Sequence, residues 1–380
     1  MKNKPVIIYS GYNNRAVVAW LRYFSAHQIP YFIIARDKED YIHLTSYKDA
    51  VVKTRTRKEL LVDELIEVKR HICAKHPQFQ NADFLILPSS EFLNRFFLAR
   101  RQEINREKMD IPLVDLALYE NISDKYAFGE ICKREGIPLP EEFKPADVKH
   151  FPVVIKPKSY FGKDNRVNMK PAIIEHKAML DQFFSEHHPS EFYIQQFVGG
   201  RSYYLLMYMK KNGEYVCYSQ ENLIQQYDGR SITGAVSSDI HHSEITDLFA
   251  RLLRKQGFHG LIMIEVKVDR DQFYMIEANP RIWGPSQLIL DANMQLMDYF
   301  ALENGLLEEV SIPSPYKSGV RYFWSGGIIE DLHAGHPIAF HQYTKEQFFN
   351  DYHLWMAKDI YLKEDTIRIY QKEAGVANET

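Results

Sequence analysis

Residues 257–284 read GFHGLIMIEVKVDRDQFYMIEANPRIWG and carry the most informative pattern in the chain. They contain two apolar runs, Leu261–Val268 and Phe273–Ala278, separated by a short polar cluster. Two apolar runs around a polar break predict a β-hairpin. Each run carries one glutamate among apolar residues, Glu265 and Glu277.

The length of the hairpin loop decides where these glutamates lie. If the loop is Arg270–Gln272, Asp269 faces Phe273 and Glu265 lies opposite Glu277, with Cβ atoms roughly 4.5–5.5 Å apart. A two-residue loop would place the two glutamates on opposite faces, because the side-chain period of a strand is two. We expect the arrangement in which they face each other.

Two facing carboxylates indicate a cation site, because like charges opposed on a sheet repel unless a cation lies between them. Glu277 and Asn279 share one face of the second strand. Mg²⁺ is held by one or two carboxylates plus phosphate oxygens, so Glu265, Glu277 and Asn279 are candidate ligands for Mg²⁺ or Mn²⁺. Pro280 has no N–H to donate, so it is expected to end the pairing of the two strands. Arg281 is a permanent cation suited to phosphate or carboxylate. A surface hairpin whose glutamates face water is the alternative.

Composition narrows the class of protein. The chain has 380 residues, enough for two or three domains, and a net charge of −3, which offers no basic surface for nucleic acid or anionic lipid. The N-terminus lacks the apolar length of a signal peptide, and no apolar run approaches a membrane span. The 3 cysteines are scattered and fit no disulfide or zinc spacing. We therefore predict a cytoplasmic protein that binds neither nucleic acid nor membrane.

The first 115 or so residues alternate apolar strands with helical patterns, which predicts an open parallel α/β domain. The expected strands are Val6–Tyr9, Tyr31–Ile34 and Phe84–Leu87, and the expected helices are Ala16–His27, Leu60–Ile72 and Phe92–Arg100. The loop at Gly11 lacks a G-x-G-x-x-G pattern, so no dinucleotide site is predicted there.

A second candidate motif begins with a lysine at the end of an apolar strand. Val153–Pro157 contains Lys156, and the loop 158–166 that follows contains Ser159 and Gly162. Such a lysine supplies a point charge to a phosphate, and the loop supplies backbone N–H groups. A solvent-exposed lysine at a strand end is the alternative.

Further elements follow from the same kind of pattern. Ser123 is the expected N-cap of a helix that begins near Lys125. The segment Ile224–Ser238, with its glycines, is expected to be a mobile loop. The tail 316–380 is rich in aromatic residues and histidine, and we expect it to cover a site or a partner surface. Its histidines have no acidic or cysteine partner nearby, which favours solvated or hydrogen-bonded rings over metal ligands.

Taken in order, these motifs resemble those of the ATP-grasp superfamily, especially its carboxylate–amine ligases and carbamoyl-phosphate-synthase-like members. The resemblance covers about 120–310. It rests on Lys125, Lys156, the segment Gln195–Val198 before two glycines, and the hairpin with Glu265, Glu277, Asn279 and Arg281. The most specific part is Glu277–Gly284.

The resemblance implies an α/β and α+β architecture. A pre-ATP-grasp, Rossmann-like domain would occupy 1–119, and the ATP-grasp domain 120–310. That domain would divide into a smaller subdomain at about 120–195 and a larger one at about 196–310. A C-terminal extension would occupy 311–380.

The resemblance also implies a role for each motif, with ATP lying between the two subdomains. Lys125 and Lys156 would contact its phosphates, with Ser159 and Gly162 in the phosphate loop. Gln195, Gln196, Phe197 and Val198 would border the adenine, and Glu265, Glu277 and Asn279 would hold Mg²⁺. Arg281 and Lys156 would act in catalysis. Two features depart from the family pattern: the phosphate loop has a single glycine, Gly162, and Ser202 stands near the place of an acid that contacts the ribose.

The predicted activity is that of an ATP-dependent ligase. It would activate a carboxylate, on a small molecule or a glycan, as an acyl phosphate and couple it to an amine with release of ADP and phosphate. A phosphotransferase and a non-catalytic ATP-sensing module are the alternatives. Arg230, Arg321, Tyr322 and Trp324 are candidates for substrate contacts. A homo-oligomer is compatible with these features.

Overall fold

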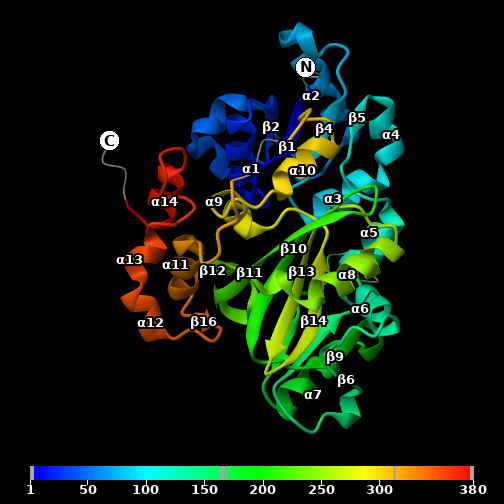
Figure 1. The fold of residues 1–380 in the computed structure, drawn as a ribbon, viewed down its shortest axis with the longest axis vertical. Helices are drawn as coiled ribbons and strands as arrows, with labels where there is room; N and C mark the ends of the chain where they lie inside the picture. Colours follow the sequence, from blue (N-terminus) through cyan, green and yellow to red (C-terminus); the bar gives the residue numbers. More distant parts are fainter. Residues whose placement is uncertain (1–3, 163–166, 168, 311–313, 377–380) are drawn as a thin grey trace.

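The chain folds around three β-sheets in the computed structural model, which describes residues 4–162, 167, 169–310 and 314–376 (Figure 1). Part of the predicted phosphate loop, residues 163–166, lies outside the described residues. No described helix combines the length and apolar composition needed to cross a bilayer.

The N-terminal part is a parallel sheet covered by helices, which confirms the predicted Rossmann-like α/β domain. Its strands, in the order β3-β2-β1-β4-β5, are β1 (Val6–Tyr9), β2 (Tyr31–Ala35), β3 (Val51–Thr54), β4 (Phe84–Leu87) and β5 (Met109–Asp110). Its helices are α1 (Asn14–Ala26), α2 (Val62–Lys75), α3 (Glu91–Ala99) and α4 (Arg101–Arg106). Each residue of β1 is buried, because a parallel sheet of this type is covered on both faces.

A small antiparallel sheet of four strands follows, in the order β6-β9-β7-β8. Its strands are β6 (Glu142–Phe143), β7 (Val153–Pro157), β8 (Ala172–Ile174) and β9 (Phe192–Gln196), and α7 (Lys177–Glu186) packs on it. Two helices, α5 (Leu116–Ser123) and α6 (Lys125–Arg134), lead into it. The predicted N-cap at Ser123 is wrong: Ser123 ends α5, its hydroxyl accepts a hydrogen bond from Arg95, and Asp124 stands at the N-cap of α6.

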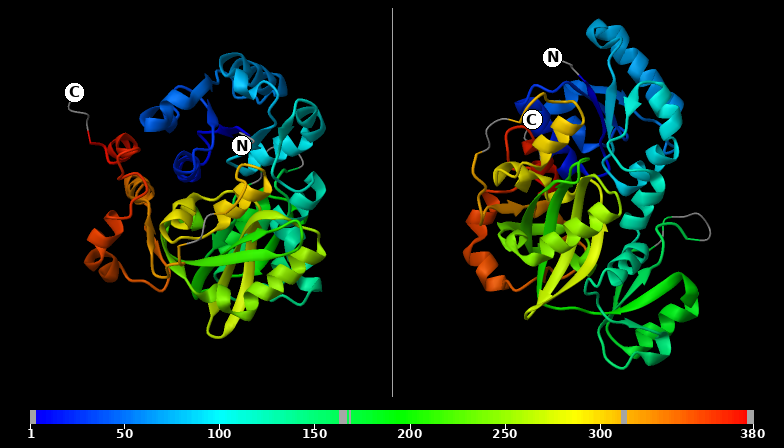
Figure 2. Two further views of the ribbon diagram at one scale, coloured as in Figure 1. Left: turned by 45° about the horizontal axis from the view of Figure 1, so that its top comes forward. Right: turned by 45° about the vertical axis from the view of Figure 1, so that its right-hand side comes forward.

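The large sheet has seven strands. Six follow the order β14-β13-β10-β11-β12-β15, and β16 pairs with β11. Their bounds are β10 (Arg201–Met209), β11 (Tyr215–Gln225), β12 (Ile232–Ser238), β13 (Gly260–Asp269), β14 (Gln272–Asn279), β15 (Arg321–Phe323) and β16 (Ala339–Phe340). In the right-hand view of Figure 2 the small sheet and its helices lie below the large sheet.

The two faces of the large sheet have different neighbours. One face packs against α8 (Glu244–Lys255), in a core that joins Leu205 and Ile264 to Phe249. The other face packs over part of its length against α9 (Gln287–Asp291), α10 (Leu296–Glu303) and α1, where Leu206 shares a core with Phe300. Ser202, Glu265 and Lys267 lie on this second face, nearer the start of β10.

The predicted hairpin is present, with a different loop from the one expected. Asp269 pairs with Gln272, so the loop has two residues, and Arg270 takes the positive φ of 55° that such a tight turn requires. A β-bulge then interrupts the ladder between the pairs Val266–Met275 and Glu265–Glu277 and leaves Ile276 as the extra residue. The bulge returns Glu265 and Glu277 to facing positions. The expectation that the two glutamates face each other is therefore confirmed, and the expected loop Arg270–Gln272 is wrong.

The segment expected to be a mobile loop is largely a strand. Residues 232–238 form β12 within the large sheet, and residues 226–231 connect β11 to it. Gly234 permits this pairing, because a Cβ there would lie 2.8 Å from the Ile224 side chain. Gly234 therefore serves close strand packing, whereas Gly229 lies in the connection and has a positive φ of 69°.

The C-terminal residues add to the large sheet through β15 and β16. The remaining helices are α11 (Ser325–His333), α12 (Lys345–Asn350), α13 (Tyr352–Met356) and α14 (Ile367–Glu373). The boundaries proposed at 119/120 and 310/311 stay predictions, but strands from both sides of the second boundary share one sheet.

Candidate functional site

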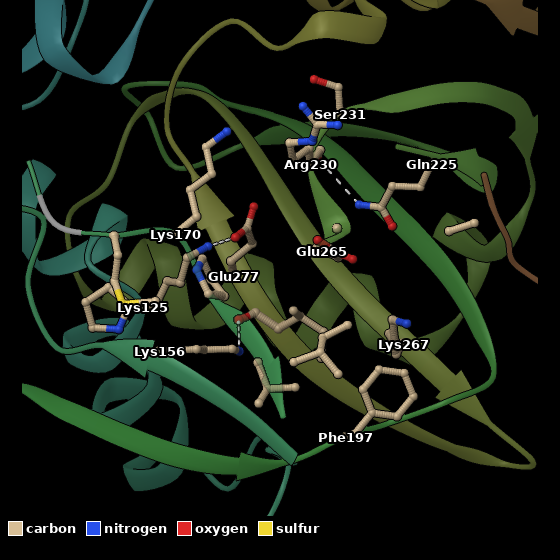
Figure 3. Close-up of a pocket in the computed structure, with 18 of the residues that line it drawn as sticks. Lys125, Lys156, Lys170, Phe197, Gln225, Arg230, Ser231, Glu265, Lys267 and Glu277 are labelled. Atoms are coloured by element: carbon tan, nitrogen blue, oxygen red, sulfur yellow. Dashed lines mark hydrogen bonds and ion pairs between the residues drawn. The ribbon is translucent and has the colours of Figure 1, made fainter. Parts of the chain in front are cut away.

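A cavity of about 950 Å³ is lined by residues of both the small and the large sheet (Figure 3). The predicted site residues that line it are Lys125, Lys156, Ser159, Gln196, Phe197, Val198, Arg230, Glu265, Glu277, Asn279 and Arg281. Residues more than 150 positions apart in the sequence thus meet in one place.

The facing glutamates lie at the centre of this cavity. The Glu277 carboxylate forms an ion pair with Lys125 and accepts a hydrogen bond from Asn279 Nδ2 at 2.7 Å. Glu265 accepts a hydrogen bond from Ser202 Oγ at 3.2 Å. Carboxylate and amide oxygens are the ligands that Mg²⁺ prefers, so the residues present fit such an ion.

Lys156 is buried, and its amino group donates to the carbonyl oxygen of Ile276 at 3.4 Å. Ile276 is the extra residue of the bulge, where ladder pairing is interrupted. Burial lowers the pKa of Lys156 to about 7, and the nearby charges of Lys125 and Lys267 add to that effect. Burial also lowers the pKa of Lys125, to about 8. An anion between these lysines would restore their preference for the charged form.

Arg281 connects the hairpin to the N-terminal domain. Its Nη2 donates to Asn279 Oδ1 at 3.1 Å, and its Nε lies 3.8 Å from Glu91 Oε2. Glu91 is the first residue of α3, and its carboxylate also accepts a 2.5 Å hydrogen bond from Tyr119. The guanidinium is thereby held at the edge of the cavity.

The other end of the cavity is more apolar. Val154, Ile173 and Met179 of the small sheet and its helix line it together with Phe197 and Val198, which belong to the connection between β9 and β10. Figure 3 shows Lys267 beside Phe197, and its amino group lies 5.6 Å from the centre of that ring. A flat aromatic base fits such a lining better than the charged end.

The C-terminal residues 337–341 and the loop 227–231 form a further wall. Arg230 forms an ion pair with Asp331 of α11, which is fully buried and also accepts a 2.8 Å hydrogen bond from the Tyr227 amide. His341 and Gln225 are hydrogen-bonded at 2.7 Å. The expectation that the tail covers a site agrees with this lining.

Five of the predicted site or contact residues are not among the described lining residues, and their roles stay predictions. Gly162 stands two residues from the lining residue Tyr160, and Gln195 is buried next to the lining residue Gln196. Arg321 donates to Asp351 at 2.7 Å, and Tyr322 is buried beside Arg15. The Trp324 indole donates to Glu373 at 3.0 Å.

The lining residues that were not predicted as site residues include Glu91, Lys267 and His341. Glu91 follows the end of strand β4, a position where parallel sheets often bind ligands, so its place was a usable signal. Lys267 stands two residues from Glu265 and therefore on the same face. His341 was expected to be solvated or hydrogen-bonded; it is hydrogen-bonded, and nothing in the local sequence indicates the cavity.

Residues 122–285 match the family model described as an ATP-grasp domain. This part of the chain is therefore an ATP-grasp domain. The match spans the small sheet, the hairpin and Arg281. No curated protein sequence matches the chain.

Solved structures of low sequence identity share the ATP-grasp fold. A biotin carboxylase from Campylobacter jejuni in complex with a β,γ-ATP ligand is 15% identical, with a TM-score of 0.59 over 83% of this chain and 74% of that one. An N5-carboxyaminoimidazole ribonucleotide synthetase bound to ADP is 13% identical, with a TM-score of 0.60 over 88% and 85%. The biotin carboxylase domain of the Hydrogenobacter thermophilus 2-oxoglutarate carboxylase, with MgADP and bicarbonate, is 12% identical, with a TM-score of 0.59 over 83% and 73%.

Proposed function

We propose that this ATP-grasp protein is an ATP-dependent ligase that activates a carboxylate as an acyl phosphate and transfers the acyl group to an amine. The observation that carries the proposal is that the facing glutamates, Glu265 and Glu277, line one cavity with cationic side chains. These include Lys125, Lys156 and Arg281. That set suits a polyphosphate bound with a divalent cation.

Each charged residue has a role in this proposal. Lys125 and Lys156 bind the ATP phosphates, and Glu265, Glu277 and Asn279 hold Mg²⁺ or Mn²⁺. When bound, the metal supplies positive charge that neutralises phosphate oxygens. Arg281, held by Asn279 and Glu91, meets the phosphoryl group as its equatorial oxygens gain charge.

The reaction has two balanced steps. A carboxylate oxygen attacks the γ-phosphorus, the bond from that phosphorus to the bridging oxygen breaks, and ADP leaves. The amine nitrogen then attacks the acyl carbon, the bond to the phosphate oxygen breaks, and phosphate leaves as the nitrogen loses its proton. Neither step needs a covalent enzyme intermediate, and fixed cations supply the main stabilisation.

Two further observations support a carboxylate substrate. Arg230 lines the cavity and is held by the buried Asp331, so a fixed guanidinium is available to an anion. The structural neighbours include a domain solved with MgADP and bicarbonate, which is itself a small carboxylate-like anion. The C–N ligase reaction itself is an inference from these features.

The test is a screen of carboxylates with ATP, Mg²⁺ and hydroxylamine. We expect one class of carboxylate to yield a hydroxamate and an equal amount of ADP, because hydroxylamine intercepts an acyl phosphate. Arg281→Ala should suppress this product more than it weakens ATP binding, since the charge it meets develops in the transition state. Release of AMP and pyrophosphate would contradict the proposal, because it indicates adenylation.

The same screen separates the two alternatives. A phosphotransferase would release ADP with a stable phosphorylated product and no hydroxamate. An ATP-sensing module would bind ATP and release no ADP with any carboxylate. Omitting Mg²⁺ is the control for non-enzymatic reaction of the carboxylate with hydroxylamine.

A further inference from the structure

The C-terminal tail contributes a strand to the sheet that carries the cavity. β16 pairs with β11, with Phe340 opposite Ile224 and Ala339 opposite Gln225. The next residue, His341, donates its backbone N–H to the Leu223 carbonyl at 2.9 Å. This backbone pairing fixes the segment whatever side chain stands at position 341.

The His341 ring is oriented by a side chain of β11. Its Nε2 lies 2.7 Å from Gln225 Oε1, and the Gln225 amide nitrogen donates to the Arg230 carbonyl at 3.5 Å. Because that amide group donates elsewhere, its oxygen accepts from Nε2–H of the imidazole. Burial lowers the pKa of His341 to about 4, so the ring is neutral at neutral pH and Nδ1 is a hydrogen-bond acceptor.

This imidazole and Gln225 both line the cavity, as does Lys267. Lys267 lies between the apolar and the cationic ends of the cavity, since it is beside Phe197 and two residues from Glu265. Lys267 is also close enough to His341 for its charge to lower the pKa of the ring. A nucleotide with its base at the apolar end and its phosphates at Lys156 has its sugar between those ends.

The hydroxyl nearest to this position on the sheet is already engaged. Ser202 lies opposite Lys267 on β10, is 1% exposed, and is not among the described lining residues. Its Oγ donates to Glu265 and accepts a 3.0 Å hydrogen bond from Asn222. A sugar hydroxyl therefore needs a partner from another element.

We propose that the C-terminal tail completes the nucleotide pocket, and that His341, oriented by Gln225, accepts a hydrogen bond from a hydroxyl of the ATP ribose. The proposal rests on the proposed ATP-dependent function and adds a residue from outside the ATP-grasp family match, which ends at residue 285. It gives the tail a role in recognising the nucleotide in addition to its role in the fold.

The test compares the binding of ATP and 2′,3′-dideoxy-ATP to the full chain by calorimetry. We expect the wild-type protein to bind ATP with an affinity about tenfold higher than that for dideoxy-ATP, which is the difference that one good hydrogen bond makes. His341→Phe keeps an aromatic ring at this position and the strand pairing of the backbone, but it removes both ring nitrogens. It should bind dideoxy-ATP within about twofold of wild type and lose most of the preference for ATP.

Two further variants complete the design. His353→Ala changes an exposed histidine of the same tail and should keep the wild-type preference. Gln225→Met leaves His341 in place but removes the hydrogen bond that orients its ring, so this variant should also lower the preference for ATP over dideoxy-ATP. If His341→Phe does not fold, Gln225→Met serves as the test.

The outcomes are distinguishable. An unchanged preference in the folded His341 variant, or in Gln225→Met if that variant alone folds, overturns the proposal. Equal wild-type affinity for the two nucleotides also overturns it. Failure of the wild-type protein to bind either nucleotide would instead contradict the proposed function.

Discussion

Lys156 is a buried lysine whose pKa of about 7 follows from burial first and from neighbouring lysines second. In the free protein a large part of it is neutral between pH 7 and 8. A bound phosphate would favour the charged form, so binding is linked to proton uptake and weakens as the pH rises above 7. The full charge is thus present only when an anion stabilises it.

This linkage gives the first prediction. At pH 8, wild-type protein should take up about 0.5–1 proton more than Lys156→Met on binding Mg·ATP, because the variant has no amine to protonate. Calorimetry in two buffers of different ionisation enthalpy measures the number, and the difference cancels the titration of the nucleotide itself. Lys144→Met, at an exposed position, is the control. Equal uptake by the Lys156 variant and wild type would rule out this role.

Glu277 gives the second prediction. Its carboxylate faces Glu265 and pairs with Lys125, so Glu277→Gln removes a charge from the proposed metal site while keeping the shape of the side chain. We expect Mg²⁺-dependent ATP turnover to fall roughly 100-fold or more, as for loss of a group that stabilises developing charge. Circular dichroism should be unchanged. Glu103→Gln, on the exposed face of α4, should retain activity; near-normal turnover of Glu277→Gln at low Mg²⁺ would exclude the metal assignment.

At the scale of elements, the hairpin illustrates what sequence patterns capture. The two apolar runs predicted both strands, and the expectation of facing glutamates was right. The loop length was not predictable, because a β-bulge compensates for the shorter loop and the apolar pattern of the two runs does not reveal it. Likewise Ile224–Ser238 has the glycine content of a loop, yet Gly234 serves close packing of two strands.

The candidate site, like the hairpin, could be predicted from the sequence only in part. Charged residues at strand ends and on the hairpin were sufficient to predict the cationic part of the cavity. The tail was expected to cover a site, but its residues 337–341 could not be singled out, since their position arises from pairing between strands more than 110 positions apart. Non-local pairing of this kind leaves no periodicity in the local sequence.

The loop between β11 and β12 gives the third prediction. It is held to α11 through Arg230, whose main partner Asp331 is buried and whose second partner Glu330 is exposed. Asp331→Asn leaves Arg230 without its buried counter-charge and should lower the free energy of unfolding by about 2–4 kcal/mol. Glu330→Gln should change it by less than about 0.5 kcal/mol, since exposed ion pairs contribute little. Urea denaturation measures both, and equal effects of the two substitutions would refute this account of the loop.

At the scale of the whole molecule, Arg15 of α1 connects three parts of the chain. Its Nη1 donates to the Ile232 carbonyl of β12 at 2.9 Å, and its guanidinium lies 3.9 Å from the centre of the Trp324 ring. Gly284 permits this approach, because a Cβ there would lie 2.8 Å from Arg15 Nη2. The glycine that ends the hairpin motif therefore lies where the N-terminal domain, the large sheet and the C-terminal tail meet.

The fourth prediction concerns this junction. Arg15→Ala should lower the free energy of unfolding by about 2–4 kcal/mol, from the lost charged hydrogen bonds and the stacking on Trp324. Arg106→Ala, at an exposed position on α4, should change it by less than about 0.5 kcal/mol. A loss of less than about 0.5 kcal/mol at Arg15, measured by urea denaturation, would show that the junction does not depend on this residue.

In the proposed reaction, a carboxylate oxygen attacks the γ-phosphorus of ATP within the cavity. The most direct test uses the carboxylate found in the hydroxylamine screen, labelled with ¹⁸O in both oxygens, together with ATP and the amine. Because the bond from the acyl carbon to that oxygen breaks in the second step, we predict one ¹⁸O atom in each released phosphate, detected by ³¹P NMR. Phosphate without the label, or label appearing in AMP, would contradict the account.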